Sequence, residues 1–395
     1  MGERRTVILL GAVGVLLFLG CCLLVAGGPF DAAPYGDVHL YRTFAHRMAR
    51  GQLPYRDFFD EYPPFAQPLF YLVKFLPGTY LPGFRWAMAL LGAGSVGLMA
   101  ASLASVHASR TRTAFAMAAA GIAPLAIGPI FLNAYDLWPA FLLALAILAF
   151  VRGRERTAYV LLALGAAAKI YPLVLLPLAV VESWERGGRE RVRSGLAWFA
   201  GALVLVHLPF AVLGPGGLRY SYWLQLKRGL EVESLGGSFL FVLDRLGLAH
   251  VTAAPAEPGS LNAVGTLADA LGTVSSLVEL AAILLVAWLF WRRRRLPFVA
   301  AAAAVLGFVA FGKVFSPQYV DWLVPLVPAA GPVAAVGTVA VAALTHVVFD
   351  RFHDSPAEAV AASVAWWAFV RNLVVVALYG VLVARLARRP RSRTA

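Results

Sequence analysis

The sequence has few charged residues and few cysteines for its length. Only 14% of its 395 residues are Asp, Glu, Lys or Arg, and 60% are hydrophobic, whereas soluble proteins are about 25% charged. The two cysteines, Cys21 and Cys22, are neighbours within an apolar run, which is typical of small apolar residues in a helix. This composition excludes a soluble multidomain enzyme, a disordered chain and a secreted disulfide scaffold. It predicts a protein that lies almost entirely in a lipid bilayer.

The short motifs of several enzyme classes are also missing. The sequence contains no Gly-x-Ser-x-Gly, His-Glu-x-x-His, Cys-x-x-Cys or Walker loop. The net charge of +13 does not indicate a nucleic-acid-binding protein, because the basic residues form short clusters between apolar stretches. Such clusters mark the cytoplasmic side of a membrane protein. We therefore expect membrane lipids as partners, and no nucleic acid.

A spanning helix needs about 20 apolar residues, and several segments approach that length. The residues 157–182 have Arg-rich flanks on both sides, which predicts two half-length helices, 157–168 and 170–182, broken at Lys169 and Pro172. We expect an all-α polytopic membrane protein, a single domain over 1–395 with about 12 membrane segments and both termini cytoplasmic. Besides the broken pair, the expected segments are 6–27, 84–106, 113–131, 135–151, 195–214, 263–291, 297–312, 319–330, 332–349 and 357–385.

Two long segments, 28–83 and 215–262, are predicted to lie outside, and the first holds most of the candidate chemistry. Its residues 37–49 have helical periodicity, with an apolar stripe and a basic stripe that includes Arg42 and His46. This pattern predicts an amphipathic helix on the membrane surface, and the stretch 65–76 is expected to lie in the interface as well. Asp37 at the start of the helix is either an N-cap or a catalytic carboxylate.

Several motifs together resemble the GT-C membrane glycosyltransferases, and most closely glycosyltransferase family 87, the polyprenyl-phosphate-mannose-dependent mannosyltransferases. The resemblance covers about residues 6–330, and its order and spacing are more specific than any single motif. The motifs are Asp37-x-x-x-Tyr41, Ala49-Arg50-Gly51-Gln52-Leu53-Pro54-Tyr55, Tyr62-Pro63-Pro64, Lys169-Ile170-Tyr171-Pro172 and Ser316-Pro317-Gln318-Tyr319.

The resemblance implies a GT-C-type bundle in the plasma membrane with its active site on the outer face. Asp37 would act as general base on an acceptor hydroxyl, and a hexose, in this family mannose, would come from a polyprenyl-phosphate donor with inversion. The acceptor would be a glycolipid, a polysaccharide or a protein. Enzymes of this type with lipid monophosphate donors generally need no metal, so we expect no metal and no cofactor.

A phosphate leaving group needs cations, and five residues are candidates to bind it. Lys169 lies at the predicted helix break with no partner nearby in the sequence, and Arg371 lies within the last apolar segment, where it binds phosphate or pairs with an acid. The other three are Lys313, Arg42 and His46, the last two with headgroup contact as the alternative. Arg228, Glu231 and Glu233 are interpreted as local salt bridges. The candidate substrate-binding residues are Tyr41, Glu61, Tyr62, Asp136, Gln318, Tyr319, Asp321, Trp322 and His353.

Three other functions remain open on the residues alone. A transporter or flippase for a lipid-linked sugar would share the apolar helices, the break at Lys169 and the buried cations. A membrane acyltransferase would use His39 or His46. A noncatalytic membrane assembly partner would keep Asp37 without using it.

Overall fold

The computed structural model describes residues 2–27, 36–256, 259–293, 297–354 and 360–388. Within these ranges, six helices are long and apolar enough to cross a membrane: α1 (Gly2–Gly27), α4 (Tyr80–Ser105), α8 (Leu176–Leu213), α11 (Thr266–Arg293), α14 (Pro332–Asp354) and α15 (Val360–Ala387). Together they support a multi-pass membrane protein. The expected total of about 12 membrane segments stays a prediction, since segments such as α6 (Leu137–Val151) and α12 (Pro297–Phe311) have only 15 residues each.

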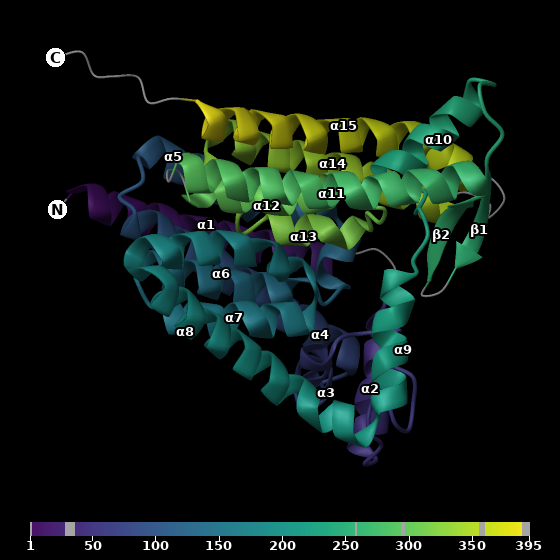
Figure 1. The fold of residues 1–395 in the computed structure, drawn as a ribbon, viewed down its shortest axis with the longest axis horizontal. Coiled ribbons are helices and arrows are strands. Elements are labelled where there is room, and N and C mark those ends of the chain that lie inside the picture. The colour runs from purple at the N-terminus through teal and green to yellow at the C-terminus, as the bar shows by residue number, and fades with distance from the viewer. Residues whose placement is uncertain (1, 28–35, 257–258, 294–296, 355–359, 389–395) are drawn as a thin grey trace.

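Most of the apolar helices lie side by side with their axes roughly along one direction (Figure 1). Helix α1 packs against α4 and α5 (Arg110–Ile127), and α14 packs against α5 and α15. Helix α1 begins and α15 ends at the same end of this bundle (Figure 1). We call this the Arg-rich end, because α1 begins there with Arg5, α5 begins there with Arg110 and Arg112, and α11 ends there with Arg292 (Figure 1).

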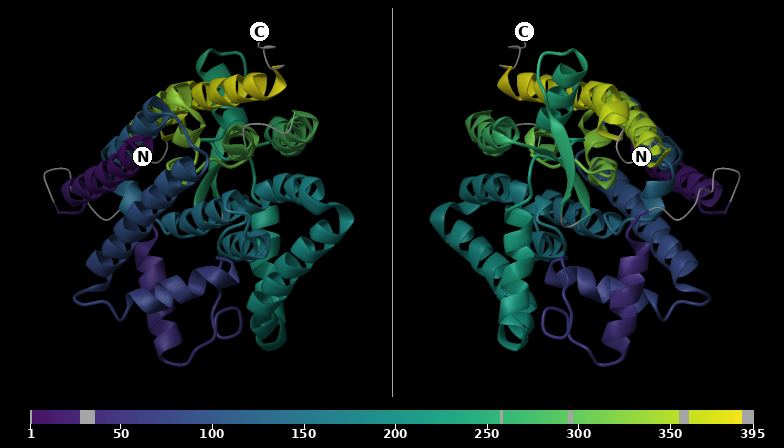
Figure 2. Two further views of the ribbon diagram at one scale, coloured as in Figure 1. Left: turned by 90° about the vertical axis from the view of Figure 1, so that its left-hand side faces the viewer. Right: turned by 90° about the vertical axis from the view of Figure 1, so that its right-hand side faces the viewer.

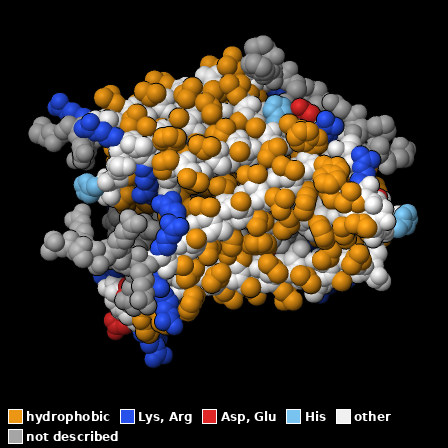
Figure 3. All heavy atoms as spheres, turned by 90° about the horizontal axis from the view of Figure 1, so that it is seen from above, with side chains coloured by type: hydrophobic (Ala, Val, Ile, Leu, Met, Phe, Trp, Pro, Cys, Tyr) orange, Lys and Arg blue, Asp and Glu red, His pale blue; other side chains and the backbone are white. Residues whose placement is uncertain are grey.

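The surface agrees with a membrane environment. Figure 3 shows one broad face that is mainly hydrophobic, with most Lys and Arg side chains gathered at the Arg-rich end. Leu205 and Val212 on α8 and Leu277 on α11 are among many large apolar side chains that the protein itself leaves exposed. A continuous apolar surface of this kind is stable against lipid rather than against water.

The opposite end of the molecule carries the first outer segment. Helix α2 (Val38–Ala49) buries Val38, Tyr41 and Ala45 and exposes Arg42 and His46, so its apolar and basic stripes lie on different faces, while its place on a membrane surface stays a prediction. After it come a 3₁₀ turn, η1 (Pro64–Ala66), and α3 (Gln67–Val73). Because α3 has only seven residues, the stretch 65–76 does not cross a membrane as a helix.

The helical structure is interrupted at Lys169, where the sequence predicts a break. Helix α7 (Glu155–Ala168) ends before Lys169, whose backbone is extended, and the 3₁₀ turn η3 (Tyr171–Leu175) leads into α8. Proline at 172 favours this break because it lacks an N–H for the helix ladder. Helix α8 is itself kinked at Gly187 and Gly188, so that the expected segment 195–214 is its second half.

The second outer segment contains the one departure from an all-α fold within the described residues. After α9 (Pro215–Leu226) and α10 (Leu235–Arg245), strands β1 (Thr252–Ala256) and β2 (Ser260–Val264) form an antiparallel hairpin, with Thr252 opposite Val264. Backbone hydrogen bonds from Val232 to Leu261 and from Ala263 to Leu230 attach the hairpin to the loop between α9 and α10. Figure 2 shows the hairpin on the end of the bundle away from the Arg-rich end.

Candidate functional site

A cavity of about 480 Å³ lies between the two outer segments and the late turn after α12. The late turn consists of the 3₁₀ helix η4 (Pro317–Tyr319) and α13 (Val320–Leu323), and a second 3₁₀ helix, η5 (Val327–Ala330), follows it. A further 3₁₀ helix, η2 (Pro129–Leu132), precedes α6. The polar and aromatic residues that line the cavity include Asp37, Glu61, Tyr62, Tyr135, Lys169, Arg228, Glu231, Glu233, Gln318, Tyr319 and Trp322. Seven of the predicted site residues therefore meet here, from positions as far apart as 37 and 322.

Asp37 lines this cavity and does not cap its helix. Its carboxylate makes no capping bond to α2, and Oδ2 instead accepts a hydrogen bond of 3.1 Å from the Tyr62 hydroxyl. Gly36 before it has φ +116, and a Cβ at this position would lie 2.7 Å from the Asn133 carbonyl oxygen. The backbone at Gly36 therefore packs closely against the loop before α6. This contact fixes the backbone position from which the Asp37 side chain extends.

Two further acids follow the first outer helix. Glu61 lines the cavity, and its burial together with the nearby charge of Asp37 raises its pKa to about 7. The charges of Arg228 and Lys169 act in the opposite direction, so all four groups lie within electrostatic reach of one another. Asp60 is fully buried outside the cavity, where burial raises its pKa to about 8 although the backbone N–H of Tyr62 donates to it.

Lys169 reaches the cavity, but it has a partner that the sequence did not reveal. Its Nζ donates to Asp136 Oδ1 at 2.6 Å, and the indole N–H of Trp322 donates to the same oxygen at 2.6 Å. The ammonium also lies 4.8 Å from the ring centre of Tyr135 and 5.5 Å from that of Tyr319. Asp136, expected to bind substrate or cap α6, makes no side-chain cap and does not line the cavity; it is fully buried and its carboxylate pairs with Lys169.

The aromatic wall of the cavity comes from the late turn. Tyr319 stacks on Trp322 with 3.9 Å between ring centres, and Trp322 stacks on Tyr171 at 4.0 Å. Gln318 lies beside them in the cavity lining. Flat rings with a few polar groups are a surface on which the apolar face of a sugar ring packs well.

Arg228 is one of the cavity residues that sequence reasoning missed, together with Tyr135, Glu231 and Glu233. It follows α9, lines the cavity and lies 3.5 Å from Glu231, which confirms the local salt bridge. Its Nε is buried and has no hydrogen-bond partner among the described residues. Glu231 is occupied elsewhere, since its carboxylate accepts from the backbone N–H of Phe315 at 2.7 Å. Arg228 therefore lines the cavity with its Nε donor unused by any described residue.

Arg371 is not free to bind a phosphate from this cavity. It is fully buried, and its guanidinium donates to the Glu233 carboxylate at 3.2 Å and to the Glu233 carbonyl at 2.7 Å. The guanidinium also lies 3.7 Å from the ring centre of Phe315. The alternative prediction, a pair with an acid of the bundle, is the correct one, and this pair places Glu233 at the cavity wall.

The other predicted cations also lie away from the cavity. Lys313 donates to the backbone carbonyl of Leu226 at 3.0 Å and so ties the late turn to the end of α9. Arg42 and His46 are exposed on the outer side of α2, because its buried side faces the bundle. Their position fits the alternative of headgroup contact.

Besides Asp136, two predicted substrate-binding residues are buried outside the cavity. Tyr41 is packed among aromatic rings, with 4.3 Å to the ring centre of Phe70, because it belongs to the buried stripe of α2. Asp321 is fully buried, and neither of its carboxylate oxygens has a partner among the described residues. The side chain of His353 lies outside the described part of the structure. The described residues contain no cluster of His, Cys, Asp or Glu suited to a metal.

Comparisons with known proteins place this geometry in a family. No curated protein sequence matches the chain. The crystal structure of ArnT from Cupriavidus metallidurans in the apo state is similar with a TM-score of 0.49 and 15% identity, over 97% of this chain and 78% of that one. The model of glycosyltransferase family 87 matches residues 59–317, which include Glu61, Tyr62, Lys169, Arg228 and the first residue of the late turn, but not Asp37. Because this match spans more than half of the chain, the protein belongs to glycosyltransferase family 87.

Proposed function

We propose that this membrane glycosyltransferase transfers a hexose, mannose, from a polyprenyl-phosphate donor to a hydroxyl of a glycolipid, polysaccharide or protein acceptor. The observation that carries the proposal is the position of Asp37, a half-buried carboxylate in the same cavity as Arg228 and Lys169. A base for the acceptor and cations for the leaving phosphate are the two requirements of the reaction.

Asp37 is suited to receive the acceptor proton. One carboxylate oxygen is held by Tyr62, and no described residue donates to Oδ1. In the proposed step the acceptor oxygen forms a bond to the anomeric carbon as its proton passes to Asp37. The bond from the anomeric carbon to the phosphate oxygen breaks at the same time, so that the configuration inverts and polyprenyl phosphate leaves.

Arg228 is suited to contact the phosphate of the donor. A guanidinium offers five N–H donors in a planar fork that matches two phosphate oxygens. Lys169 is already paired with Asp136 at 2.6 Å, so it contributes less net charge than its position alone indicates. The aromatic wall of Tyr319 and Trp322 would then support the sugar between the phosphate and Asp37.

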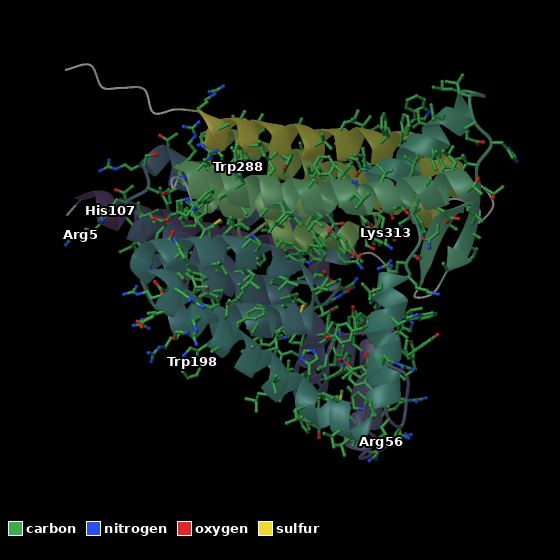
Figure 4. All side chains as sticks on the ribbon, in the orientation of Figure 1. Arg5, Arg56, His107, Trp198, Trp288 and Lys313 are labelled. Carbon is green, nitrogen blue, oxygen red and sulfur yellow. The ribbon has the colours of Figure 1, made fainter. Side chains whose placement is uncertain are left out.

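The cavity lies away from the Arg-rich end. In Figure 4, Arg5 and His107 mark the Arg-rich end, and Lys313, beside the late turn, lies towards the other. Since basic residues accumulate on the cytoplasmic side, we place the Arg-rich end and both termini in the cytoplasm and the cavity on the outer face of the plasma membrane.

The test is sugar transfer in membranes that contain the full chain, with radiolabelled polyprenyl-phosphate mannose as donor. The informative variant is Asp37→Asn. The matched control is Asp57→Asn, because Asp57 lies in the same outer segment but is bonded to Arg56 and does not line the cavity. We expect wild type and Asp57→Asn to consume the donor, and Asp37→Asn, at equal expression, to lose at least 100-fold in rate, as removal of a general base does.

Other outcomes would contradict the proposal in distinct ways. Equal rates for all three proteins would show that Asp37 is structural. Consumption of a different polyprenyl-phosphate sugar, with mannose left untouched, would correct the sugar and leave the mechanism. Movement of the lipid-linked sugar across the bilayer without transfer would favour a flippase.

A further inference from the structure

Two arginines from distant parts of the chain converge at the Arg-rich end, far from the cavity. Arg112 lies in the first turn of α5, and its Nε donates to the Ala329 carbonyl at 2.6 Å. Arg385 lies in the last turn of α15, and its Nη1 donates to the Ala330 carbonyl at 2.8 Å. These carbonyls are neighbours at the end of η5, so the two guanidinium groups lie close together.

Within the described residues no acid neutralises this pair. The hydrogen-bond partner of each guanidinium there is a backbone carbonyl and not a carboxylate, and both side chains are half-buried. They are near enough for the positive charge of Arg385 to act unfavourably on that of Arg112. Two like charges that are partly removed from water repel each other more strongly than at a free surface, and an anion between them would relieve that repulsion.

The two groups also retain hydrogen-bonding capacity. Each guanidinium has five N–H donors, and each donates one hydrogen bond to a carbonyl in the described structure. The remaining donors of two neighbouring forks are suited to the oxygens of a phosphate group.

A mainly apolar cavity, whose lining also includes the Glu182–Arg186 ion pair, lies beyond a ring that Arg112 contacts. The guanidinium of Arg112 lies 5.4 Å from the ring centre of Phe298. Phe298 in turn lines a cavity of about 200 Å³ whose other walls include Leu178 and Phe290. A phosphate-binding pair beside an apolar cavity at a membrane boundary matches a phospholipid, which carries a phosphate and an acyl chain on one molecule.

We propose that Arg112 and Arg385 bind the phosphate group of an anionic phospholipid, with an acyl chain along the cavity at Phe298. The site is separate from the sugar-transfer cavity, and the proposal does not depend on the proposed reaction. The ligand is inferred from the charge of the arginines and the shape of the cavity. Free phosphate would offer the same oxygens to the arginines, so the test distinguishes a phospholipid from free phosphate.

The test uses the full chain purified in a neutral detergent and measures lipid binding by native mass spectrometry and by thermal unfolding. The probes are phosphatidylglycerol, zwitterionic phosphatidylcholine and inorganic phosphate. The variants are Arg112→Gln and Arg385→Gln. The matched control is Arg388→Gln, because Arg388 is exposed directly after the end of the same helix and carries the same charge.

We expect phosphatidylglycerol to bind wild type and Arg388→Gln with equal affinity within twofold, and to bind each of the other two variants at least fivefold more weakly. The rise in unfolding temperature caused by phosphatidylglycerol should shrink in the same two variants. Phosphatidylcholine should give no comparable rise. If a glutamine variant does not fold, Arg112→Lys and Arg385→Lys keep the charge but lose the fork, and we expect them to weaken binding as well.

Three results would overturn the proposal. Equal weakening in Arg388→Gln would show diffuse attraction rather than a site. Unchanged lipid binding in both pair variants would show that the arginines only bind the Ala329 and Ala330 carbonyls. Inorganic phosphate that stabilises the protein as much as phosphatidylglycerol does would remove the lipid from the assignment.

Discussion

Replacing Asp136 with asparagine should destabilise the protein by leaving a cation without its partner. Asp136 is fully buried, and one of its oxygens accepts from both Lys169 and Trp322 at 2.6 Å. Asparagine keeps an acceptor for Trp322 but carries no charge. The ammonium of Lys169 would then remain in the cavity wall with no opposite charge at contact distance.

The magnitude follows from the surroundings of Lys169. Removing one partner of a fully buried ion pair costs about 3–5 kcal/mol. The side chain of Lys169 is 18% exposed, and three aromatic rings lie within 5.5 Å of its Nζ, so part of the lost attraction is replaced. We therefore expect the lower end of the range, about 3 kcal/mol.

The assay is thermal unfolding in detergent of wild type, Asp136→Asn, Lys169→Met and the double variant. If the ion pair is the cause, the double variant should be more stable than Asp136→Asn, because no unpaired charge remains in it. A loss below about 0.5 kcal/mol in Asp136→Asn would refute the reasoning. So would a double variant whose loss equals the sum of the two single losses, since the residues would then not interact.

Three further predictions concern the cavity and its supports. Arg228→Met should lower kcat/KM for the polyprenyl-phosphate donor by roughly 10–150-fold, which corresponds to the loss of hydrogen bonds to a charged group. Arg228→Lys should retain part of the wild-type kcat/KM, and initial rates against donor concentration measure both variants. Gly36→Ala should lower kcat more than it raises KM, because φ is +116 and the new Cβ would meet the Asn133 carbonyl and displace Asp37; a kcat unchanged in steady-state kinetics would contradict this. Unfolding temperature should fall as pH rises from about 4 to 8, because the buried carboxyl of Asp60 binds its proton more tightly when folded, with a pKa raised from 3.8 to about 8. The fall should be smaller in Asp60→Asn, and equal slopes in the two proteins would contradict the assignment.

The local features of the fold could be predicted from the sequence because neighbouring residues determine them. The stripe of Val38, Tyr41 and Ala45 has helical spacing, and these residues form the buried side of α2. Proline at 172 and the Arg-rich flanks predict the break after Ala168. The hairpin of β1 and β2 was not predicted, because it depends on hydrogen bonds to the loop at Leu230 and Val232, which no local pattern reveals.

The candidate site was harder to predict because it depends on distant partners. The sequence indicates that Asp37, Tyr62 and Tyr319 lie on the outer side, and all three line the cavity. It could not separate Asp37 as a helix cap from Asp37 as a cavity residue. The bond from Tyr62, 25 residues away in the chain, makes that distinction.

The choice among cations shows most clearly what the sequence lacks. Lys169 was preferred because no acid is near it in the sequence, yet its partner Asp136 is 33 residues away. Arg371 has its partner Glu233 at a separation of 138 residues. Arg228 was set aside because Glu231 lies three residues on, but this pair is the most open of the three at 3.5 Å, and Glu231 also binds the backbone at Phe315. A cation with no acid near it in the sequence can therefore still be paired in the folded bundle, so sequence separation from acids is a poor measure of which cation is free. The distance of each ion pair and the lining of the cavity are better measures, and together they favour Arg228 as the phosphate contact.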